Sequence, residues 1–213
     1  PELEGYRELV GRAGADAVVE HGVLIAEVLG LEVARIVLGE DGAVDVQVGV
    51  GKHDREAQKL LHGERPPLDA LTRAVDAVLE KRRPDAPAHP ANQLAAERWL
   101  RSVVVNDPSI VGARRLEAVA PPRLRDDLRL ANPAPAAGED ADGAPVLVVC
   151  STGIDLGLVP TAVDARLLDG RKPHLILVVP EGDDHPVTRD LAAALADPAD
   201  VVTVERDWRR RLL

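Results

Sequence analysis

The residues best suited to chemistry stand in one short segment, where an apolar run ends in the chain's single cysteine. Val146 to Val149 are continuously apolar, and Cys150-Ser151-Thr152-Gly153-Ile154-Asp155 follow them directly. Small residues at the carboxyl end of a buried parallel strand can turn backbone N–H groups toward an anion. A thiol in such a place has a lowered pKa and becomes nucleophilic. The segment predicts a site for a small anionic or phosphorylated ligand, with Cys150 as the nucleophile if the protein is an enzyme.

A second acidic segment stands in an equivalent place farther along the chain. Asp183 and Asp184 follow the apolar run 174–179 and precede Pro186. Either carboxylate suits the N-cap of a helix, and both would share a sheet edge with the cysteine segment, since parallel strands end at the same edge. The predicted ligand-binding residues are Cys150, Ser151, Thr152, Gly153, Asp155, Asp183 and Asp184. The alternative for Cys150 is a small buried hydrophobic side chain at the end of a strand.

Residues 146–168 resemble the phosphocysteine loop of the IIB subunits of the sugar phosphotransferase system. In that family a first strand ends in a cysteine that carries the phosphoryl group, and a short Ser/Thr/Gly loop and a helix follow. The resemblance implies that Val146 to Val149 form the strand and that Cys150 accepts the phosphoryl group. It also implies that Ser151, Thr152 and Gly153 cradle this group. The resemblance is confined to this segment of the chain.

The N-terminal part suggests a different chemistry. Its predicted order of helix, three strands and helix is shared with restriction-endonuclease-like nucleases, in which acidic residues on the second and third strands bind Mg²⁺. Glu32 and Asp45 are the candidate metal ligands, with Lys52 just beyond them. The acid-x-Lys motif of that family's third strand is missing, so this hypothesis rests on topology. The alternative is that both carboxylates line the solvated face of a half-buried sheet.

Apolar periodicity predicts the elements that would position these residues. A first helix is expected within 2–19, ending near Gly14, and Gly39 to Gly42 suit the turn of a hairpin. The next elements are strands at 23–28, 31–37 and 44–50, a short helix ending at 62, and helices at 68–83 and 92–107. The first fifty residues are therefore expected to form a helix and a three-stranded antiparallel meander.

The second half has a different pattern. Residues 118–145 are rich in proline, alanine and glycine, which predicts a linker between an N-terminal α+β part at 1–117 and a C-terminal unit at 146–213. In the latter, strands at 146–150, 174–179 and 200–205 alternate with helices ending near 168 and spanning 186–195. This predicts a Rossmann-like β-α-β-α-β unit and an α/β, or mixed α+β, fold class. Because three strands make a thin sheet, we expect it to pair with the N-terminal sheet or with another subunit.

Composition limits the classes of function. The formal net charge is -10, which argues against nucleic-acid binding, and Arg209-Arg210-Arg211 beside Trp208 are expected to form a solvated helical turn. The sequence has no apolar run long enough to cross a membrane, Pro1 to Glu4 have no signal-peptide features, and the single cysteine suits a reducing compartment. A cytoplasmic location is therefore expected. The sequence does not identify a cofactor or a substrate. It does not determine the oligomeric state either, and a homo-oligomer is one possibility.

Three functions are weighed on these grounds. The first is a cytoplasmic module that binds a small anionic or phosphorylated ligand at the C-terminal strand ends. The second is a non-catalytic scaffold or interaction protein, which predicts that Cys150 is inaccessible to thiol reagents in the folded protein. The third is a divergent metal-dependent nuclease that uses Glu32 and Asp45.

Overall fold

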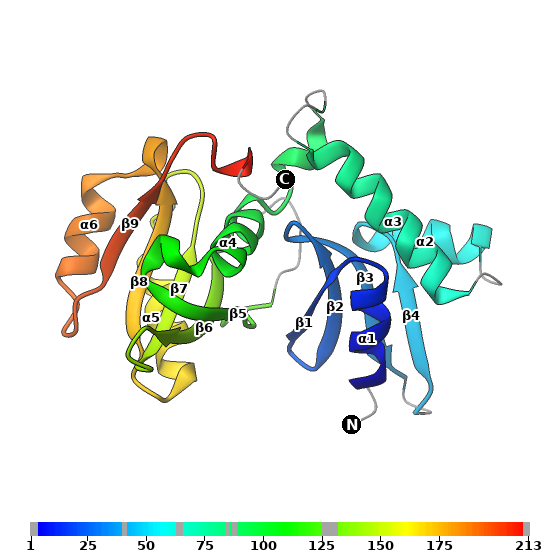
Figure 1. Ribbon diagram of the computed structural model, residues 1–213, viewed down its shortest axis with the longest axis horizontal. Coiled ribbons are helices and arrows are strands. Elements are labelled where there is room, and N and C mark those ends of the chain that lie inside the picture. Colours follow the sequence, from blue (N-terminus) through cyan, green and yellow to red (C-terminus); the bar gives the residue numbers. More distant parts are fainter. Residues whose placement is uncertain are drawn as a thin grey trace. The chain divides into compact units, whose positions relative to one another are not determined.

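The computed structural model describes residues 4–39, 42–62, 66–83, 86, 89–124 and 132–210. The chain divides into two compact units, Pro1–Asn92 and Gln93–Leu213, each with its own sheet (Figure 1). This division differs from the predicted one. The proline-rich segment 118–145 contains strand β6 (Ala134–Asp140), which pairs with a strand on either side. Its alanines fill a crowded sheet, since Ala134 and Ala136 are buried.

The first unit is an antiparallel sheet of order β1-β2-β3-β4 with helices packed on it. Its elements are α1 (Glu4–Arg12), β1 (Asp16–Glu20), β2 (Val23–Val28), β3 (Leu31–Leu38), β4 (Val44–Val48), α2 (Gly51–His62) and α3 (Pro67–Arg82). The three predicted strands are present. An additional strand, β1, occupies the stretch where the sequence predicted the end of the first helix. Gly14, with a φ of +84°, turns the chain after α1, and the β-branched Val18 and Val19 suit an extended strand.

The second unit is a five-stranded mixed sheet of order β5-β6-β7-β8-β9. Its elements are η1 (Pro90–Gln93, which bridges the boundary), α4 (Ala96–Asn106), η2 (Pro108–Val111), β5 (Ala113–Ala118), β6, β7 (Pro145–Cys150), α5 (Leu158–Asp169), β8 (His174–Pro180), η3 (Glu181–Asp183), α6 (Pro186–Ala193), β9 (Asp200–Val204) and η4 (Trp208–Arg210). Strands β7, β8 and β9 are parallel, whereas β5, β6 and β7 are antiparallel. The predicted β-α-β-α-β unit is confirmed, and β6 and β5 of the same unit widen its sheet.

Helices cover both faces of this second sheet. On one face, Leu147 and Val149 of β7 and Leu175 and Leu177 of β8 pack with α5 and α6 in a single apolar core. The alternate residues of β7, which end in Cys150, point to the other face, where α4 contacts β5, β6 and β7. None of the helices in the described stretches combines the length and the apolar character needed to cross a membrane.

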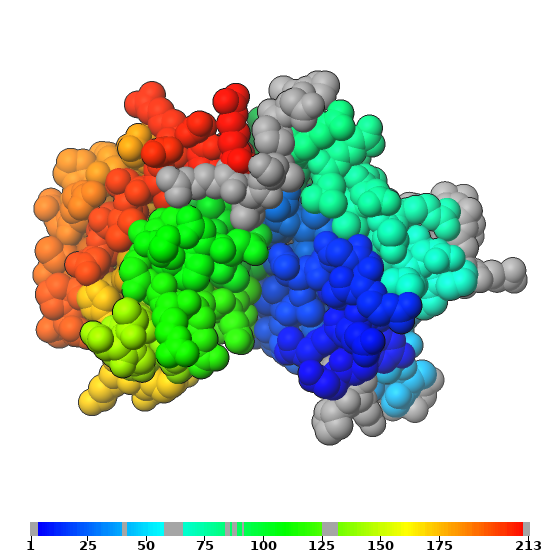
Figure 2. Space-filling model, viewed as in Figure 1, coloured from blue at the N-terminus to red at the C-terminus, as the bar shows by residue number. Residues whose placement is uncertain are grey.

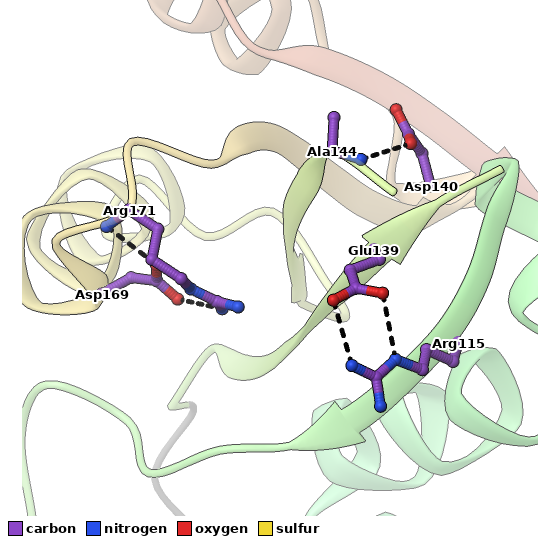
Figure 3. A network of polar contacts seen from close by, with 6 residues as sticks. All are labelled: Arg115, Glu139, Asp140, Ala144, Asp169 and Arg171. Atoms are coloured by element: carbon purple, nitrogen blue, oxygen red, sulfur yellow. Dashed lines mark hydrogen bonds and ion pairs between the residues drawn. The ribbon is translucent and has the colours of Figure 1, made fainter. Parts of the chain in front are cut away.

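A network of polar contacts lies at the end of the second sheet where β7 begins (Figure 3). Arg115 of β5 donates to Glu139 of β6 over 3.0 Å, and this ion pair lowers the pKa of Glu139. The Ala144 N–H donates to Asp140 over 2.8 Å in the turn between β6 and β7. Arg171 donates to Asp169 over 2.7 Å just after the end of α5. The Arg115–Glu139 pair is exposed, so it fixes local geometry more than it adds stability.

Candidate functional site

The two predicted ligand-binding loops meet at the carboxyl ends of β7 and β8. The Ser151 N–H donates to the Val178 carbonyl over 3.0 Å and continues the parallel ladder beyond Cys150. The Gly153 N–H then donates to the carboxylate of Asp183 over 2.7 Å. Because these two residues belong to different loops, this bond joins the segments 151–157 and 181–185. The structure therefore brings together the regions that the sequence assigned to one sheet edge.

Asp155 uses its carboxylate inside its own loop. It accepts a hydrogen bond from the Gly157 N–H over 2.8 Å, at the residue that precedes α5, and its other oxygen lies 3.5 Å from the Ser151 hydroxyl. Pro160, at the third position of α5, has no N–H to offer. The start of α5 is thus a poor place for an added anion, because a carboxylate of the chain already occupies it.

Asp184 and His185 lie at the start of α6, where the sequence predicted Asp183 or Asp184 as the N-cap. Asp184 accepts two hydrogen bonds of 2.8 Å from Arg189 of α6, and this contact lowers the pKa of its carboxyl group. The N-cap of α6 is His185, whose ring nitrogen accepts from the Val187 N–H over 3.2 Å, in place of Asp183 or Asp184. Asp184 therefore bonds to the helix that follows it, α6. Of the two aspartates, Asp183 is the one that bonds to the loop after Cys150.

Cys150 is fully buried at the end of β7. Burial raises the pKa of its thiol to about 12, although the positive charge of Arg101 opposes this shift. The thiol is therefore protonated at neutral pH and out of reach of a substrate in solution, because its side chain points to the sheet face that α4 covers. This position does not support a nucleophilic role.

Arg209 stands beside this edge of the sheet, although the sequence placed it in a solvated turn. Its guanidinium carbon lies 4.5 Å from the ring centre of Trp208 and 5.6 Å from that of Trp99. The two rings pack edge to face, with their centres 5.9 Å apart. Partial burial lowers the pKa of Arg209, while the nearby charge of Asp183 opposes this effect. One signal in the sequence could have pointed to this cluster: Trp208, one of the chain's two tryptophans, directly precedes Arg209.

The candidate nuclease residues do not form a metal site. Glu32 is buried, and it accepts hydrogen bonds from Arg35 over 3.0 Å and from Arg55 over 2.7 Å. Asp45 accepts from Gln47 over 3.0 Å and pairs across the sheet with Val37. Val37 lies five positions after Glu32 along β3, which corresponds to roughly 17 Å. Within the described residues, no group of three or more His, Cys, Asp or Glu side chains could hold a metal ion.

Exposed apolar side chains gather on one helical layer of the second unit. Among the residues that the structure describes, nine large hydrophobic side chains are exposed, and six of them belong to α5, α6 or the loop before α5. The six are Ile154, Leu156, Leu167, Leu168, Val187 and Leu191. Figure 2 shows the yellow end of α5 and the orange α6 at the molecular surface. Because its inner face buries Leu158 and Ala162, α5 carries apolar residues on both sides.

Comparisons of the chain with family models, with curated proteins and with solved structures found no match. Two features of the second unit bear on its function: the loops joined at the strand ends and the exposed apolar side chains of α5, α6 and the loop before α5.

Proposed function

We propose that the chain is a non-catalytic protein-interaction module that binds its partner through the outer surface of α5 and the loop before it. The observation that carries this proposal is the exposure of Leu167 and Leu168, at 75% and 72%, together with that of Ile154 and Leu156, at 63% and 67%. Single exposed apolar side chains are ordinary, but two adjacent ones at the end of α5 and two more in the loop before it concentrate exposed apolar area in one part of the chain, as an interaction surface does.

Burial of these side chains would supply a substantial binding free energy. Removing one leucine or isoleucine from water contributes about 1.5–3 kcal/mol. Charged side chains near the layer are already satisfied within the chain: Arg166 bonds to Asp197, and Arg189 bonds to Asp184. A partner can therefore cover the apolar side chains without leaving these charges unpaired.

The strand ends support the non-catalytic half of the proposal. The Cys150 thiol is buried and protonated, and the Gly153 N–H already has Asp183 as its acceptor. The second hypothesis expected Cys150 to be inaccessible to thiol reagents, and its buried position agrees with that expectation.

Site-specific photo-crosslinking tests this proposal. A photoreactive residue at position 156 or 168 should give discrete crosslinked species in extracts of cells that make the native chain. The matched control carries the same residue at Asp142, which is exposed in the turn between β6 and β7. If positions 156 and 168 give no crosslinks, or if position 142 gives equally strong ones, the proposal that this surface binds a partner is wrong.

A small anionic ligand at the strand ends is the second candidate, and one observation favours it. The carboxylate of Asp183 accepts the Gly153 N–H and lies near enough to Arg209 to influence its pKa. A backbone N–H and a guanidinium are the donors that bind a carboxylate or a phosphate in other proteins. Asp183 would then stand where a ligand's anionic group would bind, and a ligand would have to displace it.

Thermal unfolding tests this second candidate. Asp183→Ala and the wild type would be compared in inorganic phosphate, sugar phosphates and nucleotides. The variant should be stabilised more, by about 2.7 kcal/mol at one hundred times the dissociation constant, because its donors are vacant. The double variant Asp183→Ala/Arg209→Ala should lose this response, whereas Cys150→Ala should behave as the wild type does. If none of these compounds stabilises any variant, the ligand-binding candidate is excluded and the interaction module is the remaining proposal.

A further inference from the structure

The end of α5 has a charge pattern that is complementary to itself. The segment is Asp164-Ala165-Arg166-Leu167-Leu168-Asp169-Gly170-Arg171. At equal distances from the midpoint between Leu167 and Leu168, each acidic residue has a basic counterpart. If this segment crosses a second copy in the antiparallel direction, Asp164 meets Arg171 of the other copy and the leucines meet leucines.

The exposed members of this segment are the ones that such a contact needs. Leu167 and Leu168 are among the most exposed large hydrophobic side chains in the described stretches, and Asp164 is also exposed. The side chain of Arg171 is half exposed, at 50%. Asp164 lies on the same face of α5 as the two leucines, since residues three and four apart are neighbours on a helix.

The inner charges of the pattern are used within the chain. Arg166 donates to Asp197 over 3.1 Å, and the largely buried carboxylate of Asp169 accepts from Arg171. Gly170, with a φ of +71°, ends the helix and carries the chain beyond it to Arg171. Arg171 bonds to Asp169 through Nε and Nη2, over 2.8 and 2.7 Å, so its Nη1 group is the part of the guanidinium that Asp164 of a second copy can reach.

We infer that the partner of this surface is a second copy of the chain, an inference that rests on the proposed function. Leu167 and Leu168 of both copies lie at a twofold axis, with an Asp164–Arg171 ion pair on each side. Such an isologous contact uses the same patch twice. The ion pairs also allow two chains of net charge -10 to approach each other along this segment.

The test is the mass of the full chain in solution as a function of its concentration, measured by sedimentation or light scattering. The monomer mass is 22.7 kDa, and the wild type should approach twice this value as concentration rises. Leu167→Asp with Leu168→Asp should raise the dissociation constant by roughly a thousandfold or more, because two leucines of each copy, four in all, are lost from the contact. Leu191→Asp on α6 is the matched control and should leave the dimer unchanged.

Charge reversal gives a second, more specific measurement. Asp164→Arg alone should weaken the dimer, because it places two arginines face to face. Adding Arg171→Asp together with Asp169→Asn should restore the dimer, since the pair is then reversed across the axis and the carboxylate that Arg171 binds in its own chain is removed with it. A triple variant that dimerises no more strongly than Asp164→Arg would overturn the inferred arrangement.

The outcomes separate this inference from the proposed function. A wild type that keeps the monomer mass at all concentrations, yet crosslinks through position 168 to another protein, overturns the second copy as partner and leaves the interaction surface in place. Failure of both measurements overturns both. A dimer that Leu167→Asp with Leu168→Asp does not weaken places the dimer contact elsewhere and also overturns the inference.

Discussion

Among single residues, Cys150 is the one whose chemistry burial changes most: its thiol lies at the end of β7, and desolvation raises its pKa to about 12. Alternate residues of β7 point to opposite faces of the sheet, and Cys150 points to the face that α4 covers. The position of α4 arises from tertiary packing. The sequence therefore places Cys150 correctly at the end of an apolar strand but does not show which face of the sheet it occupies.

The buried thiol predicts a specific dependence of stability on pH. In the unfolded chain the thiol ionises near its ordinary pKa of 9.0, whereas in the folded chain it stays protonated to about 12. Above pH 9 the unfolded state binds fewer protons, so the free energy of unfolding should fall by about 1 kcal/mol for each pH unit up to 12. Below pH 9 the thiol contributes no pH dependence.

Urea unfolding of the wild type and of Cys150→Ala between pH 8 and 11 measures this effect. The alanine variant loses packing contacts at every pH, but it has no thiol to ionise. The difference in free energy of unfolding between the two proteins should therefore shift steadily in favour of the variant above pH 9. A difference that stays constant with pH would contradict the burial of Cys150.

At the scale of elements, long apolar runs are predicted well and strands without them are missed. The sequence predicts β7 and β8 within about a residue of their ends, because buried parallel strands are continuously apolar. It misses β6, whose Ala134-Pro135-Ala136-Ala137-Gly138 contains no β-branched residue. The pairing of β6 with β5 and β7 holds these residues extended, and pairing partners distant in sequence cannot be read from local composition.

Gly138 shows why small residues suit β6. A Cβ atom at this position would lie 1.9 Å from the carbonyl oxygen of Arg115 in β5. Gly138→Ala should therefore push β5 away and lower the free energy of unfolding by about 1–3 kcal/mol, as overpacking does elsewhere. Gly182→Ala is the control, because nothing lies within 4 Å of its added Cβ. Equal denaturant midpoints for the two variants would show that β5 does not pack closely on β6.

At the scale of the whole molecule, the predicted domain boundary differs from the boundary in the structure. The predicted C-terminal unit begins at 146 and contains β7, β8 and β9 with their helices. The structure gives that sheet two more strands and places α4 on its other face, so the compact unit begins at Gln93. Composition favoured a linker at 118–145 because proline and glycine are frequent in linkers. In β6, however, Pro135 stands at the start of the strand and Gly138 allows the close approach of β5, which are positions that these residues also suit.

Truncation distinguishes the two boundaries. A fragment of residues 93–213 should fold and unfold cooperatively, because it retains both faces of the sheet and both members of the Trp99–Trp208 pair. A fragment of residues 146–213 should not, because the face of β7 that contains Cys150 would lie open to water and Trp208 would lose its aromatic partner. Circular dichroism and tryptophan fluorescence during urea unfolding would report both results. If 93–213 fails to fold, the second sheet needs the first unit for stability, and the two units form one cooperative structure.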